Sequence, residues 1–300
     1  MSGKVVLITG ASKGLGYITA KVLGEKFPGS FFFLAGKSRE YFDPTIGAHC
    51  EYINMDVTEE ESVYKVRNMI QSRHDALDIL INNAGTYEVP DTSSAAHFGA
   101  QAERILGTNY WGLKRVTRVM GKLMRPGARI VNTSSHLGHL SNINGEDFYA
   151  FKIREALANI DISELRLDAL MTEFRDMAHS GEWEFGGWPS CAHTVSKIGV
   201  NVYTRILQRQ FDRDTDFKMM GTDDIVVNSI HPGTHHSKIN PRSRIPLEKG
   251  AEAIAALACV PHGSLAGQVV WHNMTPITWE EAVTRPSLIN TQGIQGQLSC

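Results

Sequence analysis

The chain has 300 residues, of which 42% are hydrophobic and 21% are charged, and its formal net charge at pH 7 is -2. This composition is ordinary for a soluble globular protein, and the length allows one sizeable hydrophobic core. The near-neutral charge gives no reason to expect a nucleic acid partner, and no apolar run approaches the length needed to span a bilayer. A strand pattern begins within three residues of Met1, so we expect no signal peptide.

The four cysteines, Cys50, Cys191, Cys259 and Cys300, show no C-x-x-C spacing. This pattern argues against a zinc ribbon and a disulfide framework, and it suits a reducing compartment. Cys300 is the last residue, whereas a C-a-a-X lipidation signal needs three residues after its cysteine. We therefore expect a cytoplasmic protein.

Short apolar runs alternate with helical periodicity in the first half of the chain. The predicted strands are Val5–Ile8, Phe31–Leu34, Tyr52–Ile53, Leu77–Ile81 and Ala128–Asn132. Between them, apolar residues recur at helical spacing over Leu15–Val22, Val63–Ile70 and Ile105–Leu123. Strands buried on both faces and separated by helices predict a doubly wound parallel sheet, the Rossmann fold.

The alternation stops between Leu140 and Gly187, where the sequence favours helix and holds no strand-like run. We interpret residues 141–187 as a helical insertion in a single domain that covers residues 1–272. The alternation then returns, with predicted helices through Val195–Ile206 and Leu247–Cys259 and predicted strands at Ile225–Ile230 and Gly267–Trp271. Residues 273–300 form a C-terminal tail without a clear period.

A glycine-rich turn, Thr9-Gly10-Ala11-Ser12-Lys13-Gly14-Leu15-Gly16, follows the first strand. Glycines at such a turn let the backbone approach a pyrophosphate, which then lies on a helix N-terminus. The spacing is G-x-x-x-G-x-G rather than the commoner G-x-G-x-x-G, but its place between the first strand and the first helix makes it specific. We predict a dinucleotide site that includes Gly10, Ser12, Lys13, Gly14, Leu15 and Gly16.

The end of the second strand predicts which dinucleotide binds. An acidic residue there would bind the ribose 2′-hydroxyl and select NAD, but this sequence has Ala35-Gly36-Lys37-Ser38-Arg39. Lys37 and Arg39, together with Lys13, place cations where a 2′-phosphate would lie. We therefore predict that the cofactor is NADPH.

Asp56 and Val57 follow the third predicted strand. The Asp56 carboxylate is placed to hydrogen-bond the adenine amino group of the cofactor. Its alternative role is to cap the helix that follows, although Thr58 suits that role better.

Five motifs occur in an order that resembles the short-chain dehydrogenase/reductase family. They are Thr9–Gly16, Asn82-Asn83-Ala84-Gly85, Asn109, Asn132-Thr133-Ser134-Ser135 and Ser196-Lys197, and the resemblance covers about residues 4–271. Within the family the chain is most similar to the monomeric carbonyl reductases, because of the long insertion and the run Gly187-Trp188-Pro189-Ser190. In that subgroup the insertion covers the face used elsewhere for dimerisation, so the resemblance implies a monomer.

The resemblance also implies a reaction, hydride transfer from NADPH to a ketone, aldehyde or quinone. Ser135 would orient the substrate carbonyl, and Asn109 would hold a water in a proton relay. Lys197 would contact the nicotinamide ribose and lower the pKa of the proton donor. The other implied cofactor-binding residues are Asn83, Ala84, Gly85, Pro232, Gly233 and Ser237.

The family's catalytic tyrosine is replaced in this sequence. Its motif is Tyr-x-x-x-Lys, and the position four residues before Lys197 is His193, on the same helix face. Burial and the charge of Lys197 would lower the imidazole pKa from its usual value of about 6.5. A neutral ring could donate a hydrogen bond but would be a poor acid, so we expect slow reduction that accelerates below neutral pH. The alternative is an NADPH-binding protein that has lost catalysis and serves a binding or regulatory role.

Tyr149 is the other tyrosine with a spacing to Ser135 that occurs in short family members. Its lysine, Lys152, follows three residues later rather than four, and no apolar helix pattern like that of Val195–Ile206 surrounds it. A catalytic acid must reach the reacting oxygen, and we interpret Tyr149 as an ordinary residue of the insertion.

Five histidines are expected around the mouth of the substrate cleft: His136, His139, His231, His235 and His236. They show no H-E-x-x-H or comparable spacing, so we expect polar lining of the cleft rather than a metal site. His231 and Thr234 stand where the family's carbonyl reductases usually carry a cysteine and a tryptophan, which predicts a more polar and less aromatic pocket.

Overall fold

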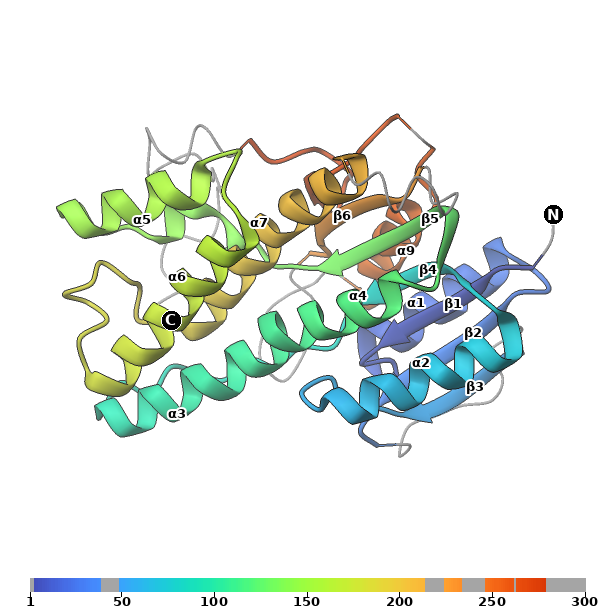
Figure 1. Ribbon diagram of the computed structural model, residues 1–300, viewed down its shortest axis with the longest axis horizontal. Helices are drawn as coiled ribbons and strands as arrows, with labels where there is room; N and C mark the ends of the chain where they lie inside the picture. The colour runs from blue at the N-terminus through green and yellow to red at the C-terminus, as the bar shows by residue number, and fades with distance from the viewer. Residues whose placement is uncertain (1–2, 39–48, 214–223, 234–245, 262, 279–300) are drawn as a thin grey trace.

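Seven strands form one sheet in the computed structural model, which describes residues 3–38, 49–213, 224–233, 246–261 and 263–278. The strands are β1 (Val5–Thr9), β2 (Phe31–Gly36), β3 (His49–Asn54), β4 (Leu77–Asn82), β5 (Met124–Thr133), β6 (Val226–His231) and β7 (Val269–Trp271). Their order is β3-β2-β1-β4-β5-β6-β7, and every neighbouring pair is parallel (Figure 1). The predicted doubly wound parallel sheet is confirmed.

Helices cover both faces of the sheet, which is why the central strands read as continuous apolar runs. One face packs against α2 (Glu60–His74), α4 (Leu113–Gly121) and α7 (Ala192–Arg213). The other packs against α1 (Gly14–Lys26) and α9 (Leu247–Leu257). Alternate residues of β1 divide between the two layers: Leu7 belongs to the first core, and Val6 and Ile8 belong to the second.

Two elements differ in their bounds from the sequence prediction. The long helix predicted to reach Leu123 consists of α3 (Ala95–Leu106), a π-helical turn η1 (Gly107–Gly112) and α4. Strand β5 begins at Met124, earlier than predicted, because Met124 pairs with Leu77 ahead of a register shift in the ladder. The π-helical turn is relevant to function, because such turns are frequent at functional sites.

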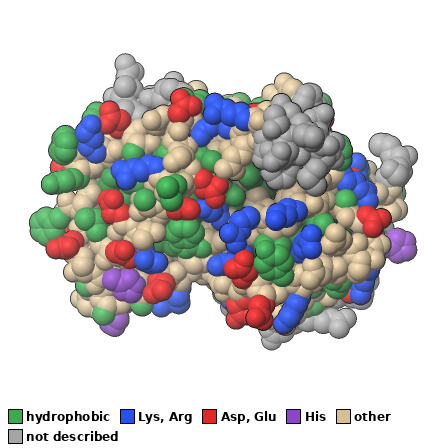
Figure 2. Space-filling model, viewed as in Figure 1, with side chains coloured by type: hydrophobic (Ala, Val, Ile, Leu, Met, Phe, Trp, Pro, Cys, Tyr) green, Lys and Arg blue, Asp and Glu red, His purple; other side chains and the backbone are tan. Residues whose placement is uncertain are grey.

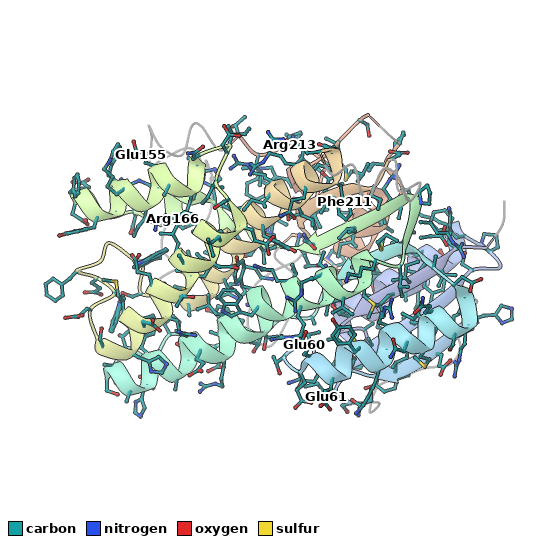
Figure 3. The ribbon with its side chains drawn as sticks, viewed as in Figure 1. Glu60, Glu61, Glu155, Arg166, Phe211 and Arg213 are labelled. Carbon is teal, nitrogen blue, oxygen red and sulfur yellow. The ribbon has the colours of Figure 1, made fainter. Side chains whose placement is uncertain are left out.

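The predicted insertion is helical, as expected. It holds two helices, α5 (Phe148–Ala158) and α6 (Glu164–Ser180), and two short turns, η2 (His136–Gly138) and η3 (Leu140–Asn142), lead into it. Helix α6 packs along α3 and α7, while exposed polar residues such as Glu155 of α5 and Arg166 of α6 face outward (Figure 3). Figure 1 shows α3, α5 and α6 lying beyond the carboxyl ends of the strands, so the insertion flanks that edge of the sheet.

A charged cluster fixes the insertion to the domain. The Lys114 ammonium of α4 forms ion pairs with Glu164 at 2.7 Å and Asp168 at 2.6 Å, both on α6. The Tyr110 hydroxyl donates a further hydrogen bond to Asp168 at 2.7 Å. Because Lys114 is largely buried, these contacts hold α6 against α4 more firmly than an exposed ion pair would.

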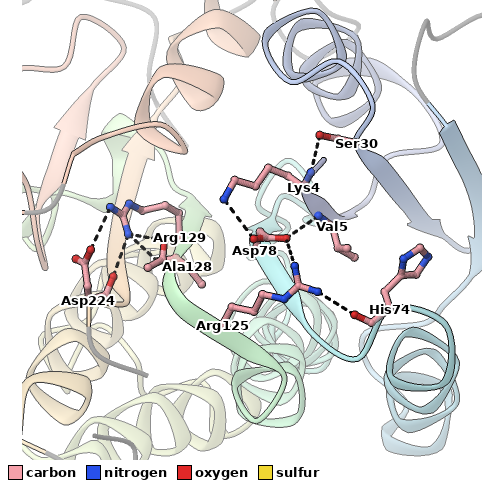
Figure 4. A network of polar contacts seen from close by, with 10 residues as sticks. Lys4, Val5, Ser30, His74, Asp78, Arg125, Ala128, Arg129 and Asp224 are labelled. Carbon is pink, nitrogen blue, oxygen red and sulfur yellow. Dashed lines mark hydrogen bonds and ion pairs between the residues drawn. The ribbon is translucent and has the colours of Figure 1, made fainter. Parts of the chain in front are cut away.

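The amino-terminal edge of the sheet carries a polar network around Asp78 and Arg129, each of which has several partners (Figure 4). The Asp78 carboxylate accepts from the Val5 amide at 2.8 Å and from the guanidinium of Arg125 at 3.1 Å, and it pairs with Lys4 at 3.3 Å. Nearby, the Arg129 guanidinium donates to the backbone carbonyls of Val260, Gly127, Ala128 and Asp224. These contacts tie the starts of β1, β4 and β5 together.

The chain turns back after β7, and part of the predicted tail therefore pairs with the sheet. Pro276 forms an antiparallel bridge with Val270, and the Ile277 amide donates to the Val269 carbonyl at 2.7 Å. None of the described helices is both long enough and apolar enough to span a membrane. Acidic and basic side chains are interspersed over the face shown in Figure 2.

Candidate active site

The four residues expected to be catalytic meet at the carboxyl-terminal edge of the sheet. Ser135 follows β5, Asn109 lies on the π-helical turn, and His193 and Lys197 lie on the first turns of α7. Parallel strands end at one edge, which places these elements together. Hydrogen bonds join Asn109 to the loop after β4 and to α7, and Lys197 of α7 bonds to the Thr133 carbonyl, two residues before Ser135.

The ring of His193 faces the loop that follows β4. Its Nδ1 lies 3.2 Å from the carbonyl oxygen of Thr86 and 3.4 Å from the side-chain amide nitrogen of Asn109. A carbonyl oxygen only accepts hydrogen bonds, so Nδ1 carries the proton and donates it to Thr86. The Nε2 atom of the neutral ring is then an acceptor. We expected the neutral ring to donate a hydrogen bond toward a substrate. That expectation is wrong, because the single N–H of the ring is bonded to Thr86 inside the protein.

The pKa of His193 is lowered to about 3, chiefly by burial and then by the charge of Lys197, with His136 adding to the effect. The hydrogen bond to Thr86 acts in the opposite direction but does not offset them. The direction is the one expected from the sequence, and its size moves the imidazolium out of the neutral range. Acceleration from this group is thus expected only near pH 3, rather than just below neutrality.

Lys197 is buried, and its ammonium donates to the Thr133 carbonyl at the end of β5 at 2.8 Å. Burial lowers the pKa of Lys197 to about 8. The side chain therefore still carries a charge at neutral pH, close to the backbone that leads into Ser135. Its Nζ also lies 3.6 Å from where a side chain on Gly85 would begin, so the cofactor loop and the lysine are neighbours.

Ser135 begins the short turn η2. Its Oγ accepts a hydrogen bond from the Leu137 amide at 3.2 Å. That contact uses a lone pair of the hydroxyl and leaves its hydrogen able to point elsewhere. The geometry suits the predicted role, donation of a hydrogen bond to a carbonyl oxygen.

The side chain of Asn109 holds the site together rather than facing a substrate. Its Oδ1 accepts from the Thr86 amide at 2.7 Å, and its Nδ2 donates to the Thr86 carbonyl at 2.9 Å and to the Ser196 hydroxyl at 3.0 Å. Both amide hydrogens are thereby used. Asn109 fixes Thr86, and Thr86 in turn fixes the ring of His193.

Polar atoms without partners gather at the same edge. Within the part of the chain that the structure describes, the Thr133 and Ser134 hydroxyls and both ring nitrogens of His136 are buried and make no hydrogen bond. Burial lowers the pKa of His136, so this ring is also neutral at pH 7. Buried polar groups normally have partners, and such a cluster indicates that another molecule completes it.

The remaining histidines are only partly described. His231 packs against His136, with ring centroids 5.1 Å apart, and His139 contacts Ser141 at 2.8 Å. His235 and His236 lie outside the described residues, as do Arg39, Thr234 and Ser237. No three His, Cys, Asp or Glu side chains within the described ranges are placed to hold a metal ion.

The glycine-rich turn is locked to the motif that follows β4. The Asn83 side-chain amide donates to the Thr9 and Gly10 carbonyls at 3.0 and 3.1 Å. Gly10 has a φ of 65°, and a Cβ on it would lie 2.7 Å from Ala84. A Cβ on Gly16 would lie 2.5 Å from the Asn83 amide nitrogen, so both positions require glycine.

A cavity of about 610 Å³ continues from this turn across the ends of β2, β3 and β4. It is lined by Gly36 and by residues of the predicted cofactor site, namely Gly10, Lys37, Val57, Ala84 and Gly85. Ser12 contacts Gly36 from the turn, Lys13 and Gly14 are exposed, and Leu15 is half-buried. Pro232 and Gly233 are buried directly after β6. The structure therefore brings the described members of the predicted set to one edge.

Lys37 and Asp56 form an ion pair of 2.6 Å at the far end of this cavity. Although burial alone would raise it, the pKa of Asp56 is lowered by hydrogen bonds from Lys37 and Thr58. Both the amide and the hydroxyl of Thr58 donate to Asp56, and the N-cap of α2 is Glu59. The suggested capping role of Thr58 is therefore wrong, because its hydroxyl donates to Asp56, two residues earlier in the chain.

Sequence reasoning missed Thr86 and Tyr87. Thr86 acts through its backbone, which leaves no mark on residue identity. The ring of Tyr87 lies edge-on to His193, with centroids 5.1 Å apart. Its position directly after Asn83-Ala84-Gly85-Thr86 was the available signal. By contrast, Tyr149 is 61% exposed on α5, which agrees with its interpretation as an ordinary residue of the insertion.

Comparisons with known proteins agree on one family. The family model described as short chain dehydrogenase matches residues 4–153. The chain is 30% identical to carbonyl reductase (NADPH) 1 of Mus musculus, over 87% of this chain and 92% of that protein. It is also 30% identical to short-chain dehydrogenase/reductase 1 of Saponaria officinalis, over 91% and 96%. Among solved structures, salutaridine reductase from Papaver somniferum superposes with a TM-score of 0.71 at 23% identity, covering 89% of this chain and 99% of that one, which supports the fold.

Proposed function

Because this chain is an oxidoreductase of the short-chain dehydrogenase family, we propose that it reduces ketones, aldehydes or quinones with NADPH. The observation that carries the proposal is the position of Lys197, which donates to the Thr133 carbonyl two residues before Ser135 and lies next to Gly85 of the glycine-lined cavity. The relatives named carbonyl reductase (NADPH) support the same substrate class and cofactor.

The described residues fit a dinucleotide. The close approach of Gly10 and Gly16 to Asn83 and Ala84 leaves the backbone of the turn open to a pyrophosphate. Lys37 at the far end of the cavity would contact the 2′-phosphate, and Asp56 the adenine. The unpartnered hydroxyls of Thr133 and Ser134 lie where β5 ends, next to Lys197 and in reach of the nicotinamide end.

When bound, NADPH would supply the hydride. The Ser135 hydroxyl would donate a hydrogen bond to the substrate carbonyl and fix its orientation. The Lys197 ammonium would favour the negative charge that develops on that oxygen, an effect strengthened by its burial. Asn109 would keep the loop after β4 and α7 in register while this happens.

His193 is the weak part of this arrangement. At neutral pH its ring has no proton to give, because the pKa is about 3 and the single N–H is bonded to Thr86. Loss of one acid–base group commonly costs about 10²- to 10⁴-fold in rate, which leaves room for slow turnover. A second candidate function, an NADPH-binding protein without catalysis, rests on this same replacement.

We also propose a monomer located in the cytoplasm. Helix α6 of the insertion packs along α3 and α7 and is fixed to α4 by Lys114. A partner subunit would have to displace it to reach those helices. Sedimentation should give a species near 33.2 kDa, and a stable dimer at micromolar concentration would contradict the proposal.

The test of function is NADPH oxidation with a reactive quinone and an aromatic aldehyde. Slow turnover of at least one is expected, and Ser135→Ala and Lys197→Ala should each lower it. Ser135→Ala should retain NADPH binding in a fluorescence titration, because its role is toward the substrate carbonyl, whereas Lys197→Ala should also weaken binding through its expected contact with the nicotinamide ribose. Tight NADPH binding without any turnover would favour the non-catalytic alternative.

A further inference from the structure

Carbonyl reduction needs a proton for the alkoxide oxygen, and the residue that replaces the family's tyrosine does not hold one. The Nδ1–H of His193 is bonded to the Thr86 carbonyl, and Nε2 is an acceptor. The inference below rests on the proposed function and concerns which side chain supplies that proton.

Tyr87 lies beside the position that lacks its tyrosine. Its ring centroid is 5.1 Å from that of His193, with the two rings inclined at 77°. The side chain is half-buried, and the two residues before it, Gly85 and Thr86, line the predicted cofactor cavity. The ring of Tyr87 therefore packs against the imidazole at the start of α7, and Tyr87 directly follows two residues that line the cavity.

The backbone that leads to Tyr87 is held by hydrogen bonds to both the amide and the carbonyl of the preceding residue, Thr86. Asn109 accepts from the Thr86 amide at 2.7 Å and donates to the Thr86 carbonyl at 2.9 Å. The same carbonyl also accepts from His193 at 3.2 Å. A side chain that begins one residue further along is thus held close to the active-site helix, as pre-organised catalysis requires.

Other proton sources are less well placed. Tyr149 is 61% exposed on α5, outside the cluster around His193. Both ring nitrogens of His136 are buried among protein atoms, and Lys197 donates to the Thr133 carbonyl. Tyr87 is the described phenol in ring contact with His193.

We propose that the Tyr87 phenol is the proton donor of this reductase, in place of the tyrosine that His193 replaces. The carbonyl carbon gains the hydride from NADPH, the C=O π bond breaks, and the oxygen takes the phenol proton as an O–H bond forms. The phenolate is reprotonated by water from the cleft, so one hydride and one proton are consumed per alcohol formed.

The test compares four proteins: wild type, Tyr87→Phe, His193→Tyr and the double variant. Turnover of an aromatic aldehyde is measured at saturating NADPH, and NADPH affinity is measured separately by fluorescence. Tyr87→Phe keeps the ring and its edge contact, so folding should be preserved. Tyr149→Phe is the matched control, a phenol lost from an exposed site.

Tyr87→Phe should lower kcat at least about tenfold with unchanged NADPH affinity, while Tyr149→Phe should leave kcat within about twofold. In the His193→Tyr background the same change should cost less than about threefold, because the new tyrosine donates the proton. An unchanged kcat in Tyr87→Phe, or an equal loss in both backgrounds, would overturn the inference and leave the proposed function standing. Absence of turnover in both wild type and His193→Tyr would overturn both.

Discussion

The two edges of the sheet differ in how many hydrogen-bond partners their polar groups have. At the amino-terminal edge, Asp78 has three partners, and Arg129 is bonded to four carbonyls. At the carboxyl-terminal edge, the hydroxyls of Thr133 and Ser134 and the ring of His136 are buried without partners among the described residues. Unsatisfied buried groups cost free energy, so the contrast separates an edge that serves stability from one arranged for a ligand.

The largest expected effect is a loss of stability on substitution of Asp78 at the amino-terminal edge. Asp78→Ala leaves the Val5 amide and the Arg125 and Lys4 charges without their common acceptor, and it should lower the free energy of unfolding by about 3 kcal/mol. The loss should fall at the low end of the range for buried pairs, because Lys4 and Arg125 are each about 40% exposed. Urea denaturation measures it, and NADPH affinity should not change.

The matched change at the other edge is Ser134→Ala. Since this hydroxyl is buried without a partner, its removal should alter stability by less than about 1 kcal/mol and weaken NADPH binding instead. A loss of stability as large as that of Asp78→Ala would show that the two edges do not differ.

Acid should destabilise the carboxyl-terminal edge selectively. The pKa of His193 is about 3 in the folded protein, against an ordinary value near 6.5 in the unfolded chain. Between these values the unfolded state binds a proton that the folded state does not, so stability falls as pH falls below 6.5, by up to about 1.4 kcal/mol per pH unit. The lowered pKa of His136 acts in the same direction.

His193→Gln removes this titration and should flatten the fall in stability between pH 6.5 and 4.5 by about 2 kcal/mol. Thermal denaturation across that range measures the difference. The control variant, measured in parallel, is His97→Gln at an exposed histidine of α3. Identical profiles for wild type and His193→Gln would refute the lowered pKa.

The smallest expected effect concerns cofactor choice. NADPH should bind at least about tenfold more tightly than NADH, and Lys37→Asp should shrink that preference, because it removes a cation from the 2′-phosphate. Asp56, which pairs with Lys37, would then face a second carboxylate. Fluorescence titration with both dinucleotides measures the preference, and equal affinities in wild type would contradict it.

The sequence predicted much of the fold because parallel strands and helices leave distinct periods. The runs at Val5–Ile8 and Leu77–Ile81 are buried strands, and the insertion is helical. The bounds of β5 depend on pairing with β4, and the π-helical turn depends on packing, neither of which a local pattern records.

The same limit applies to the candidate site. Ser135, Asn109, His193 and Lys197 were identified through the resemblance to the short-chain dehydrogenases, and the structure places Asn109 beside His193 and Ser196 on α7. The hydrogen bond from the His193 N–H to the Thr86 carbonyl could not be predicted. Every residue has a backbone carbonyl, so the sequence does not mark this acceptor. Tyr87 was missed because it contacts His193, a residue far along the chain, which no local spacing rule records.

The measurement that tests the central account most directly is carbonyl reduction by His193→Tyr and wild type at saturating NADPH, from pH 5 to 8. If position 193 limits the enzyme, the variant should be faster by at least about tenfold, because a tyrosine one helical turn from Lys197 should be a more effective proton donor than Tyr87. Wild type should show no acceleration from His193 in that range, since its pKa is about 3. Equal rates for the two proteins would contradict the claim that His193 impairs catalysis.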